Sequence, residues 1–393
     1  MPTPADSGSS RPHRPARHAR TALAPALALM CALALFQPVP RASAGDGPGG
    51  KVLVYSATGA TTAALPLMGA LERGWPGSPV AVEEWKNLDD LRGLVLSGKG
   101  DVWVGHLEAF GRAAARGAGV RILAVTAWRK FYFVSGPFRG PADGEGGRGG
   151  TPGPGTPGGE AGYWPQSPGE LASLLASERL PLYAAPQSGP STGILSRIAA
   201  MGGPSFDARA LPMQQVLLEL ASGRARAALV PEPGATAALA KNPRLRIVGS
   251  LEDEHARLAG GPGRLPHAGI AADASFVREQ PGLVRELQEL MGASARELAA
   301  MPPEEAVTHL PRALREAVGE TVLAESLARD PIGSVNAADA AHEIEGFLCL
   351  AAAELCAGGR LDPAFPRDFI LENPPPGPVG TTVPDAPEEA GAR

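Results

Sequence analysis

Hydrophobic positions along the chain form short apolar runs that alternate with segments of helical periodicity. Asn87 suits a helix N-cap and Gly98 a helix C-cap, so one helix is expected between them. Repeated strand and helix segments with short loops predict a mainly parallel sheet covered by helices on both faces. The expected strands of this first block are 51–55, 80–85, 101–105 and 120–128, and its other expected helices are 61–72 and 107–116.

The same alternation starts again after a Gly- and Pro-rich stretch, which predicts a second α/β unit. Residues 267–272 then form one further strand-like run, and helical patterns continue to about residue 358. The expected strands of the second unit are 180–184, 206–211, 227–230 and 245–251. One expected helix follows the turn at 187–193 and ends at 201, a second covers 213–222, and a third begins at 231–234.

Two segments lack the apolar residues that a folded segment needs. Residues 139–161 are almost entirely Gly, Pro and charged residues, and residues 374–393 are Pro-rich and acidic. Such segments bury too little apolar surface to offset the loss of conformational entropy on ordering. We therefore expect both to remain solvated.

The N-terminus has the layout of a secretory signal peptide. A polar stretch with four arginines precedes an uncharged run over 21–36, and Ala42-Ser43-Ala44 follows as a small-residue cleavage pattern. The apolar run is shorter than the ~20 residues of a membrane-spanning helix. We predict cleavage near Ala44 and export to the periplasm, with an uncleaved N-terminal anchor as the alternative.

The net charge argues against one class of partner. Residues 1–44 contain five arginines and one aspartate, so their removal takes the formal net charge from −5 to −9. A net-negative chain without a basic stripe argues against nucleic acid as a partner. The remaining 349 of the 393 residues are too many for one compact core, which favours two lobes.

Two cysteines remain after such a cleavage, in a stretch that reads as helix. Cys349 and Cys356 are seven residues apart, a helical rise of ~10.5 Å. A disulfide needs Cα atoms within ~7 Å, so this spacing argues against one, and against a metal pair. We expect two apolar core thiols.

Polar turns at two strand–helix junctions are the strongest candidates for a binding site. Ligands of open α/β sheets bind at the carboxyl ends of strands, where helix N-termini present free N–H groups. Hydroxyls there form a neutral pocket for an oxyanion or a carbonyl group. The alternative is that these residues only cap helices. The turns contain Ser56, Thr58, Gly59, Ala60 and Thr61 in the first unit, and Ser188, Gly189, Ser191 and Thr192 in the second.

Several stretches resemble one known family. SGKGDVWVG at 97–105, followed by GVRILA at 119–124, resembles the first lobe of the nitrate/sulfonate/taurine-type solute-binding proteins of ABC importers. APQSGPSTG at 185–193 and LASGRARAALVPEP at 220–233 are similar to second-lobe segments of that family. Residues 273–284 resemble the stretch where the chain has returned to the first lobe, so the resemblance covers roughly 51–372 in order.

This resemblance implies an α/β, two-lobed type 2 periplasmic-binding-protein fold, in which each lobe is a mainly parallel sheet flanked by helices. The lobes would close like a hinge on a solute that contacts both of them. The implied ranges are 51–136 and 262–372 for the first lobe, 137–168 for an insertion at the inter-lobe crossover, 169–261 for the second lobe and 373–393 for a disordered tail.

The resemblance also implies the partners. They are a small polar solute of anionic or zwitterionic character and an ABC permease/ATPase complex at the inner membrane, with the chain itself a monomer. No cofactor, metal or catalytic residue is implied. Two features depart from the family: the insertion replaces a short crossover, and Arg224-Ala-Arg226 stands where an acidic residue is typical.

The expected ligand contacts lie at strand ends and in the two polar turns. Trp85 and Trp128 would wall an apolar part of the solute, or pack ordinarily within the lobe. His106 would donate to an anion, or simply face solvent. Glu232 would receive an ammonium or hydroxyl group, or bond its own turn. The full set is Tyr55, Ser56, Thr58, Gly59, Trp85, His106, Trp128, Ser188, Ser191, Thr192 and Glu232.

Two other functions compete with a carrier. An enzyme on the same scaffold, related to thiamine-precursor or menaquinone-pathway proteins, would need a nucleophile, an acid–base pair or a metal set. His106 with Glu108 is the nearest approach to such a pair. A periplasmic ligand sensor is the second alternative. Glu83, Glu84 and Glu108 near the expected site leave a cationic or zwitterionic solute open.

Overall fold

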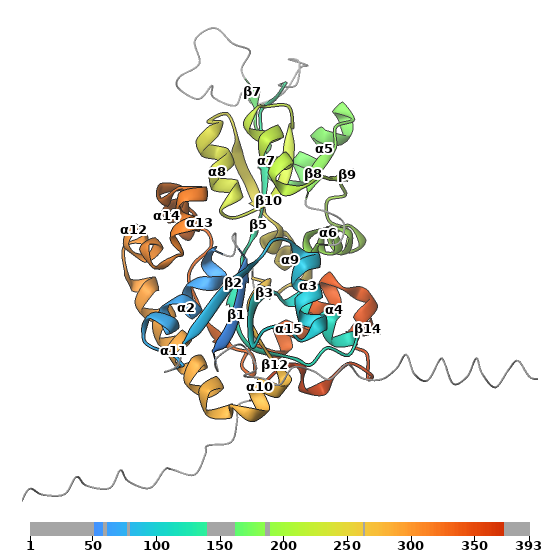
Figure 1. The fold of residues 1–393 in the computed structure, drawn as a ribbon. Coiled ribbons are helices and arrows are strands. Elements are labelled where there is room, and N and C mark those ends of the chain that lie inside the picture. Colours follow the sequence, from blue (N-terminus) through green and yellow to red (C-terminus); the bar gives the residue numbers. More distant parts are fainter. Residues whose placement is uncertain are drawn as a thin grey trace, which may run out of the picture. The chain divides into compact units, whose positions relative to one another are not determined.

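Two large β-sheets are built from the alternating apolar runs, and helices pack on them (Figure 1). The computed structural model describes residues 51–57, 61–76, 79–139, 162–184, 189–261 and 264–372. All of these belong to one compact unit of the chain, residues 42–393. The predicted signal peptide, the predicted tail and most of the predicted insertion lie outside the described residues.

The first sheet has six strands in the order β13-β4-β12-β3-β1-β2. β1 runs parallel to β2 and β3, whereas β12 runs antiparallel to both β3 and β4. Every residue of β12 is buried, which places this strand in the middle of the core. The strands are β1 (Val52–Ala57), β2 (Val80–Trp85), β3 (Val102–His106), β4 (Val120–Ala127), β12 (Ala268–Asp273) and β13 (Val335–Asn336).

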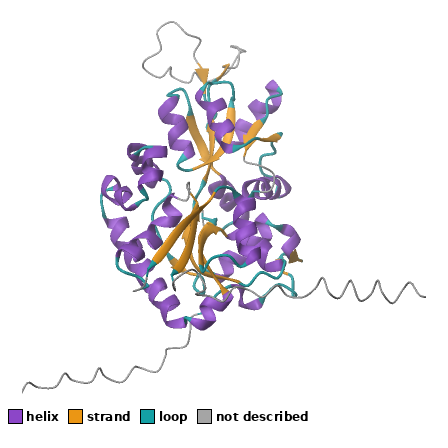
Figure 2. Cartoon of the chain, viewed as in Figure 1, coloured by secondary structure: helices purple, strands orange, loops and turns teal. Residues whose placement is uncertain are grey.

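Helices cover both faces of this sheet, as Figure 2 shows. On one face α2 (Thr61–Glu72) packs against α11 (Pro281–Ala300), with α10 (Ala274–Glu279) beside them. On the other face lie α3 (Leu88–Ser97), α4 (Leu107–Ala115) and α15 (Ala341–Ala351). We call this sheet and these helices, with α12 (Pro303–Ala306), α13 (Arg312–Val318) and α14 (Glu320–Leu327), the first lobe.

The second sheet has five strands in the order β11-β5-β10-β8-β9. β8 is parallel to β9 and β10, and β5 is antiparallel to β10 and β11. We call this sheet and its helices the second lobe. Its strands are β5 (Phe131–Ser135), β8 (Leu182–Ala184), β9 (Ala208–Ala210), β10 (Ala227–Pro231) and β11 (Arg246–Ser250), and its helices are α5 (Pro168–Glu178), α6 (Pro190–Ala200), α7 (Met213–Ala221), α8 (Gly234–Lys241) and α9 (Leu251–Ala259).

The predicted position of the insertion needs correction. β5 falls inside the range predicted for the first lobe, yet it pairs with β10 and β11 of the second sheet. The chain therefore crosses between the sheets at residues 128–130, before the insertion begins. The insertion leaves from the second lobe, where β6 (Phe138–Arg139) pairs with β7 (Gly162–Tyr163) at its base.

The prediction of two unpaired cysteines is wrong. Cys349 and Cys356 form a disulfide with a Cα–Cα distance of 5.5 Å. The helical spacing does not apply because α15 ends at Ala351, and Cys356 already lies in the short strand β14 (Cys356–Ala357), paired with β15 (Arg360–Leu361). The turn after α15 brings the second cysteine back to the first.

Membrane association through a spanning helix finds no support in the described part of the chain. None of the helices there combines the length and the apolar character needed to cross a bilayer.

Candidate functional site

Two predicted site residues flank the same point of the first sheet. His106 at the end of β3 is the register partner of Ala268, the first residue of β12. Ala127 at the end of β4 is the partner of Ala268 on its other side, and Trp128 follows directly. The carboxyl ends of β3 and β4 therefore bring His106 and Trp128 to one edge of the sheet, on either side of β12.

His106 carries a buried polar atom with no partner. The residue is half-buried, but its Nδ1 is shielded from solvent and has no hydrogen-bond partner among the described residues. Removal from water, followed by the positive charges of His267, Lys130 and Arg92, lowers the pKa of His106 to about 4. The imidazole is therefore neutral at physiological pH.

Trp128 also carries a buried polar atom without a partner among the described residues. Its indole Nε1–H is buried and has no acceptor among the described residues. The face of the ring is covered by the guanidinium of Arg264, 4.3 Å from the ring centroid. Because an indole N–H can only donate, this group suits a solute that presents an acceptor.

The second lobe contributes Ser191 at the start of α6. Ser191 is buried, and its hydroxyl has no hydrogen-bond partner among the described residues. Thr192 beside it is half-buried. The first turn of α6 also carries backbone N–H groups that the helix itself does not satisfy, so it favours an anion or a carbonyl oxygen.

The start of α6 is pressed against the first lobe. A Cβ atom placed on Gly193 would lie 2.8 Å from the carbonyl oxygen of Ala351, the last residue of α15. Such a contact joins backbone to backbone, and only glycine permits it. Ser191 is therefore held close to the boundary between the lobes.

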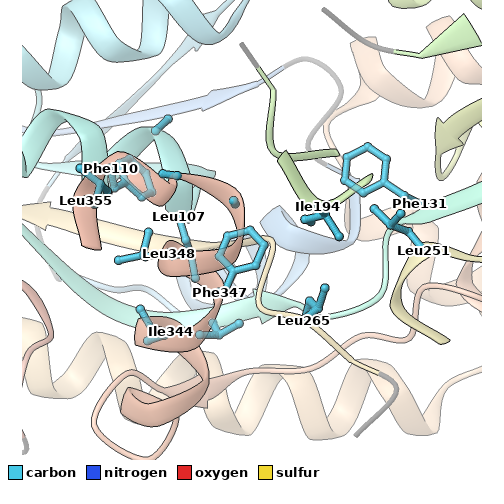
Figure 3. Close-up of a cluster of buried hydrophobic side chains, with 14 of the residues drawn as sticks. Leu107, Phe110, Phe131, Ile194, Leu251, Leu265, Ile344, Phe347, Leu348 and Leu355 are labelled. Carbon is cyan, nitrogen blue, oxygen red and sulfur yellow. The ribbon is translucent and has the colours of Figure 1, made fainter. Parts of the chain in front are cut away.

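One hydrophobic cluster runs through both lobes at this boundary (Figure 3). Figure 3 shows Phe347 of α15 between Phe110 and Leu355 on one side and Ile194 of α6 on the other. Leu107 adjoins His106, Ile194 lies one helical turn after Ser191, and Trp128 packs against the cluster. Trp128 thus contacts this buried cluster directly, and His106 and Ser191 lie close in sequence to two of its members.

Charged side chains near this boundary are already paired. Lys130 Nζ lies 2.6 Å from Asp330 Oδ2 and 3.4 Å from Thr62 Oγ1, and Thr62 itself donates to Asp330. Asp330 and Thr62 are fully buried. The carboxylate of Asp330 thus contacts Thr62 in the first turn of α2. This turn directly follows one of the polar turns predicted to hold a solute anion.

For Glu232 the structure shows the second of the two interpretations, in which the carboxylate bonds its own turn. Its carboxylate accepts from Thr236 N and Thr236 Oγ1, both at 3.0 Å, and from Arg329 Nε at 2.5 Å. Tyr132 of β5 donates to the backbone oxygen of Arg329 at 2.6 Å. Arg329 and Asp330 thus link α8 and β5 of the second lobe to α2 and Lys130, and Glu232 has no free oxygen for a solute cation.

Two other predicted ligand contacts, Tyr55 and Trp85, form hydrogen bonds within the first lobe. The Tyr55 hydroxyl donates to Glu83 at 2.6 Å, and burial, followed by this bond, raises the pKa of Tyr55. The Trp85 indole donates to Val104 O at 2.9 Å and is buried in the core, as its alternative interpretation stated. Ser56 is buried on β1, and Thr58, Gly59 and Ser188 lie outside the described residues.

Glu108, which with His106 is the nearest approach to an acid–base pair in the sequence, forms ion pairs with arginines. Glu108 is fully buried and lies against Arg92 at 3.2 Å and against Arg112, rather than against His106. Burial raises the pKa of Glu108, and the two guanidinium groups oppose that rise. In the described part of the chain, no group of three or more His, Cys, Asp or Glu side chains is placed to hold a metal ion.

Sequence reasoning missed the residues that join the lobes. Lys130, Glu252, His267, Arg329 and Asp330 are polar residues buried or partly buried at the boundary. Lys130 directly precedes the apolar run of β5, and recognition of that strand would have placed Lys130 at the crossing. Arg329 and Asp330 follow α14 and lie 93 to 268 residues from their partners, so no local pattern marks them.

The arrangement favours recognition by neutral donors. The indole of Trp128 and the hydroxyl of Ser191 donate, His106 can donate from Nδ1, and the neighbouring full charges on Lys130 and Glu232 are compensated within the protein. Neutral donors satisfy the oxygens of an acceptor-rich solute.

Solved structures share this fold at low sequence identity. An ABC transporter protein from Parabacteroides distasonis matches with a TM-score of 0.57 and 17% identity, over 82% of this chain and 99% of that one. The periplasmic aliphatic sulphonate-binding protein SsuA of Escherichia coli matches with a TM-score of 0.54 and 14% identity, over 87% and 98%. The ligand-binding component of an ABC-type import system from Staphylococcus aureus matches at 0.53 and 11%, over 76% and 90%.

These likenesses confirm the predicted fold, that of two-lobed periplasmic binding proteins. Sequence identities of 11–17% establish the fold but not the function. No protein-family model matches the chain. No curated protein matches it by sequence either.

Proposed function

We propose that this protein is the exported solute-binding component of an ABC importer, which holds a small acceptor-rich solute between its two lobes. The observation that carries this proposal is that three of the predicted ligand contacts have buried polar atoms without partners among the described residues, namely His106 Nδ1, Trp128 Nε1 and Ser191 Oγ. A buried polar group without a partner costs about 1–3 kcal/mol, and a solute that satisfies all three recovers that cost.

The solute class follows from the chemistry of these groups. Two of them are neutral donors, and the turn of α6 adds backbone N–H groups, so an oxyanion head such as a sulfonate, nitrate or carboxylate fits best. The adjoining apolar cluster would accept a short hydrocarbon portion. A taurine-like zwitterion would need a carboxylate for its ammonium, and Glu232 is already occupied.

Export is part of the proposal. It rests on the predicted signal peptide, on the fold shared with a periplasmic protein, and on the disulfide between Cys349 and Cys356. Disulfides persist in oxidising compartments such as the periplasm and are rare in the cytosol. The proposed partners are therefore the solute and an inner-membrane permease/ATPase complex, and the proposed oligomeric state is a monomer.

A thermal-shift screen tests the proposal. The purified exported protein is melted with nitrate, short alkanesulfonates, taurine, carboxylates and pyrimidines. A solute at a hundredfold excess over its Kd stabilises the folded state by ~2.7 kcal/mol, so a binding solute raises the melting temperature clearly. We expect a sulfonate or another oxyanion to do so. The absence of a shift with every solute would contradict the proposal.

Trp128→Phe tests the site itself. The substitution removes the indole N–H and keeps an aromatic ring under Arg264, so we expect about a 3- to 10-fold rise in Kd for the solute found in the screen. Trp164→Phe is the matched control, because Arg246 stacks on Trp164 in the same way, at 5.4 Å from the ring centroid. Calorimetric titration of both variants measures the effect, and equal Kd values would remove Trp128 from the site.

A further inference from the structure

The chain crosses between the lobes twice within the described residues, and the two crossings lie side by side. The outgoing segment, residues 128–130, joins β4 to β5. The returning segment, residues 264–267, leads into β12. Leu265 N donates to Trp128 O at 2.7 Å, and His267 N donates to Ala127 O at 2.9 Å. A change in the angle between the lobes must therefore pass through these two segments.

One carboxylate oxygen holds both segments. Glu252 Oε1 accepts from Lys130 N at 2.8 Å and from Phe131 N at 3.1 Å, on the outgoing side. The same oxygen lies 2.7 Å from His267 Nε2, on the returning side. Glu252 is the second residue of α9, so the contact ties the second lobe to both crossings at a single point.

The contact is isolated from water. Glu252 and His267 are both fully buried. The His267 ring lies edge-on between Phe131 of the second lobe, at 5.1 Å, and Phe347 of the first lobe, at 5.2 Å. Hydrogen bonds to a charged acceptor are strong in such surroundings, and a lost partner is costly.

The charge of Glu252 is supported by its donors. Burial alone would raise the pKa of the Glu252 carboxyl, but the hydrogen bond and charge of His267, with the backbone N–H of Lys130, lower it below its usual value. A negative carboxylate is the form that accepts three donors at one oxygen. The geometry and the charge therefore agree.

We infer that Glu252 is a positioning residue that fixes the pivot about which the two lobes are oriented. This inference rests on the proposed function in one respect: a fixed pivot would then keep His106 and Trp128 in register with Ser191 for a solute. Without the carboxylate, two buried backbone N–H groups and one imidazole nitrogen lose their acceptor, and the lobes sample a wider range of orientations.

Distances between the lobes test the inference without any solute. Spin labels are attached to cysteines placed at Leu96 of α3 and Leu218 of α7, which are 40% and 60% exposed. Pulsed electron paramagnetic resonance then gives the distance distribution for the full-length exported protein. For Glu252→Ala we expect the distribution to broaden to about twice the width of the parent.

Two variants separate positioning from general destabilisation. In Glu252→Gln the amide oxygen can still accept from Lys130 N and Phe131 N, so we expect a width close to that of the parent. Glu254→Gln makes the same change two residues further along α9, where the partner is Arg257 at 2.6 Å, and should leave the width unchanged. A folded Glu252→Ala protein with the parental width would overturn the inference.

A second substitution decides the matter if Glu252→Ala fails to fold. His267→Phe keeps an aromatic ring between Phe131 and Phe347 and removes only the link to the carboxylate. We expect a broadened distribution for this variant too, and a parental width would reject the pivot.

A titration with methanesulfonate keeps the inference distinct from the proposed function. If the parent binds it, a tenfold smaller competent population in Glu252→Ala raises the apparent Kd about tenfold. If the parent binds neither methanesulfonate nor any solute of the screen, the proposed function fails, and the label distances still decide the pivot.

Discussion

At the scale of single residues, the proposed binding chemistry depends on buried polar atoms that the protein itself leaves unsatisfied. Tyr55, Trp85 and Glu232 have polar side chains whose partners lie within the protein. His106, Trp128 and Ser191 have buried polar atoms that find no partner among the described residues. Tyr55, Trp85 and Glu232 therefore stabilise the fold, whereas His106, Trp128 and Ser191 are the residues proposed to contact a solute.

The low pKa of His106 predicts a stability loss in acid. The folded-state pKa of about 4 lies below the ordinary value of 6.5, so the unfolded chain binds more protons between these pH values. Stability therefore falls as the pH drops from about 6.5 to about 4, by up to about 3 kcal/mol from this residue. Urea unfolding at both pH values should show a smaller loss in His106→Asn.

The control for this experiment is His342→Asn, which replaces an exposed histidine on α15. We expect it to retain the parental loss of stability between the two pH values. If His106→Asn shows the parental loss as well, His106 is not held neutral by its surroundings.

Local rules of residue chemistry predicted some of these features and missed others. Asn87 caps α3 by accepting from Asp89 N and Asp90 N, and Gly98 ends that helix with a φ of 65°, as predicted. Capping depends on neighbours within a few residues, so the sequence shows it directly. The partners of Glu232 and Lys130 include Arg329 and Asp330, about 100 and 200 residues away, and a single sequence does not show such pairs.

At the scale of elements, the boundary between the lobes is set by how closely α6 approaches α15. Gly193 faces the carbonyl of Ala351, while Gly346 on α15 has no atom within 4 Å of the position of a Cβ. Both glycines lie within helices, and they differ in how closely neighbouring atoms approach the position of a Cβ.

Gly193→Ala should separate these helices. The added methyl group meets backbone that cannot rotate away, so we expect a loss of about 1–3 kcal/mol in the free energy of unfolding and weaker solute binding. Gly346→Ala should stabilise the protein by about 0.5–1 kcal/mol, because alanine favours the helix. Chemical denaturation measures both, and a neutral Gly193→Ala would contradict the close approach.

The disulfide stabilises the turn that follows α15. Replacement of both Cys349 and Cys356 by serine should lower the free energy of unfolding by about 2–3 kcal/mol, as expected for a short closed loop. A reducing agent should cause a similar loss in the parent and none in the double variant. Unchanged stability of the parent under reduction would show that the cysteines are not bonded.

Element prediction succeeded where periodicity was regular. α2 and β2 begin and end at the predicted residues, although α2 contains Pro66 within the helix. β5 was missed since its run Phe131–Ser135 is entirely buried and lies close after β4, so it lacks the polar alternation of a half-exposed strand. The disulfide was missed because α15 stops at Ala351 without a Gly or Pro to signal its end.

At the scale of the whole molecule, side chains and backbone join the lobes on more than one side. Gly193 meets Ala351 through α6 and α15, Glu232 meets Arg329 beside α8 and α14, and Glu252 holds both crossings. A solute that satisfies His106 and Trp128 in one lobe and Ser191 in the other would add to these contacts. It would thereby favour the arrangement in which all of them are made.

Calorimetric titration of the purified exported protein with the best solute of the screen tests this account most directly. The account predicts one solute bound per chain and complete recovery of that solute unchanged after release. Chemical conversion of the solute, or no measurable heat of binding with any oxyanion of the panel, would contradict it.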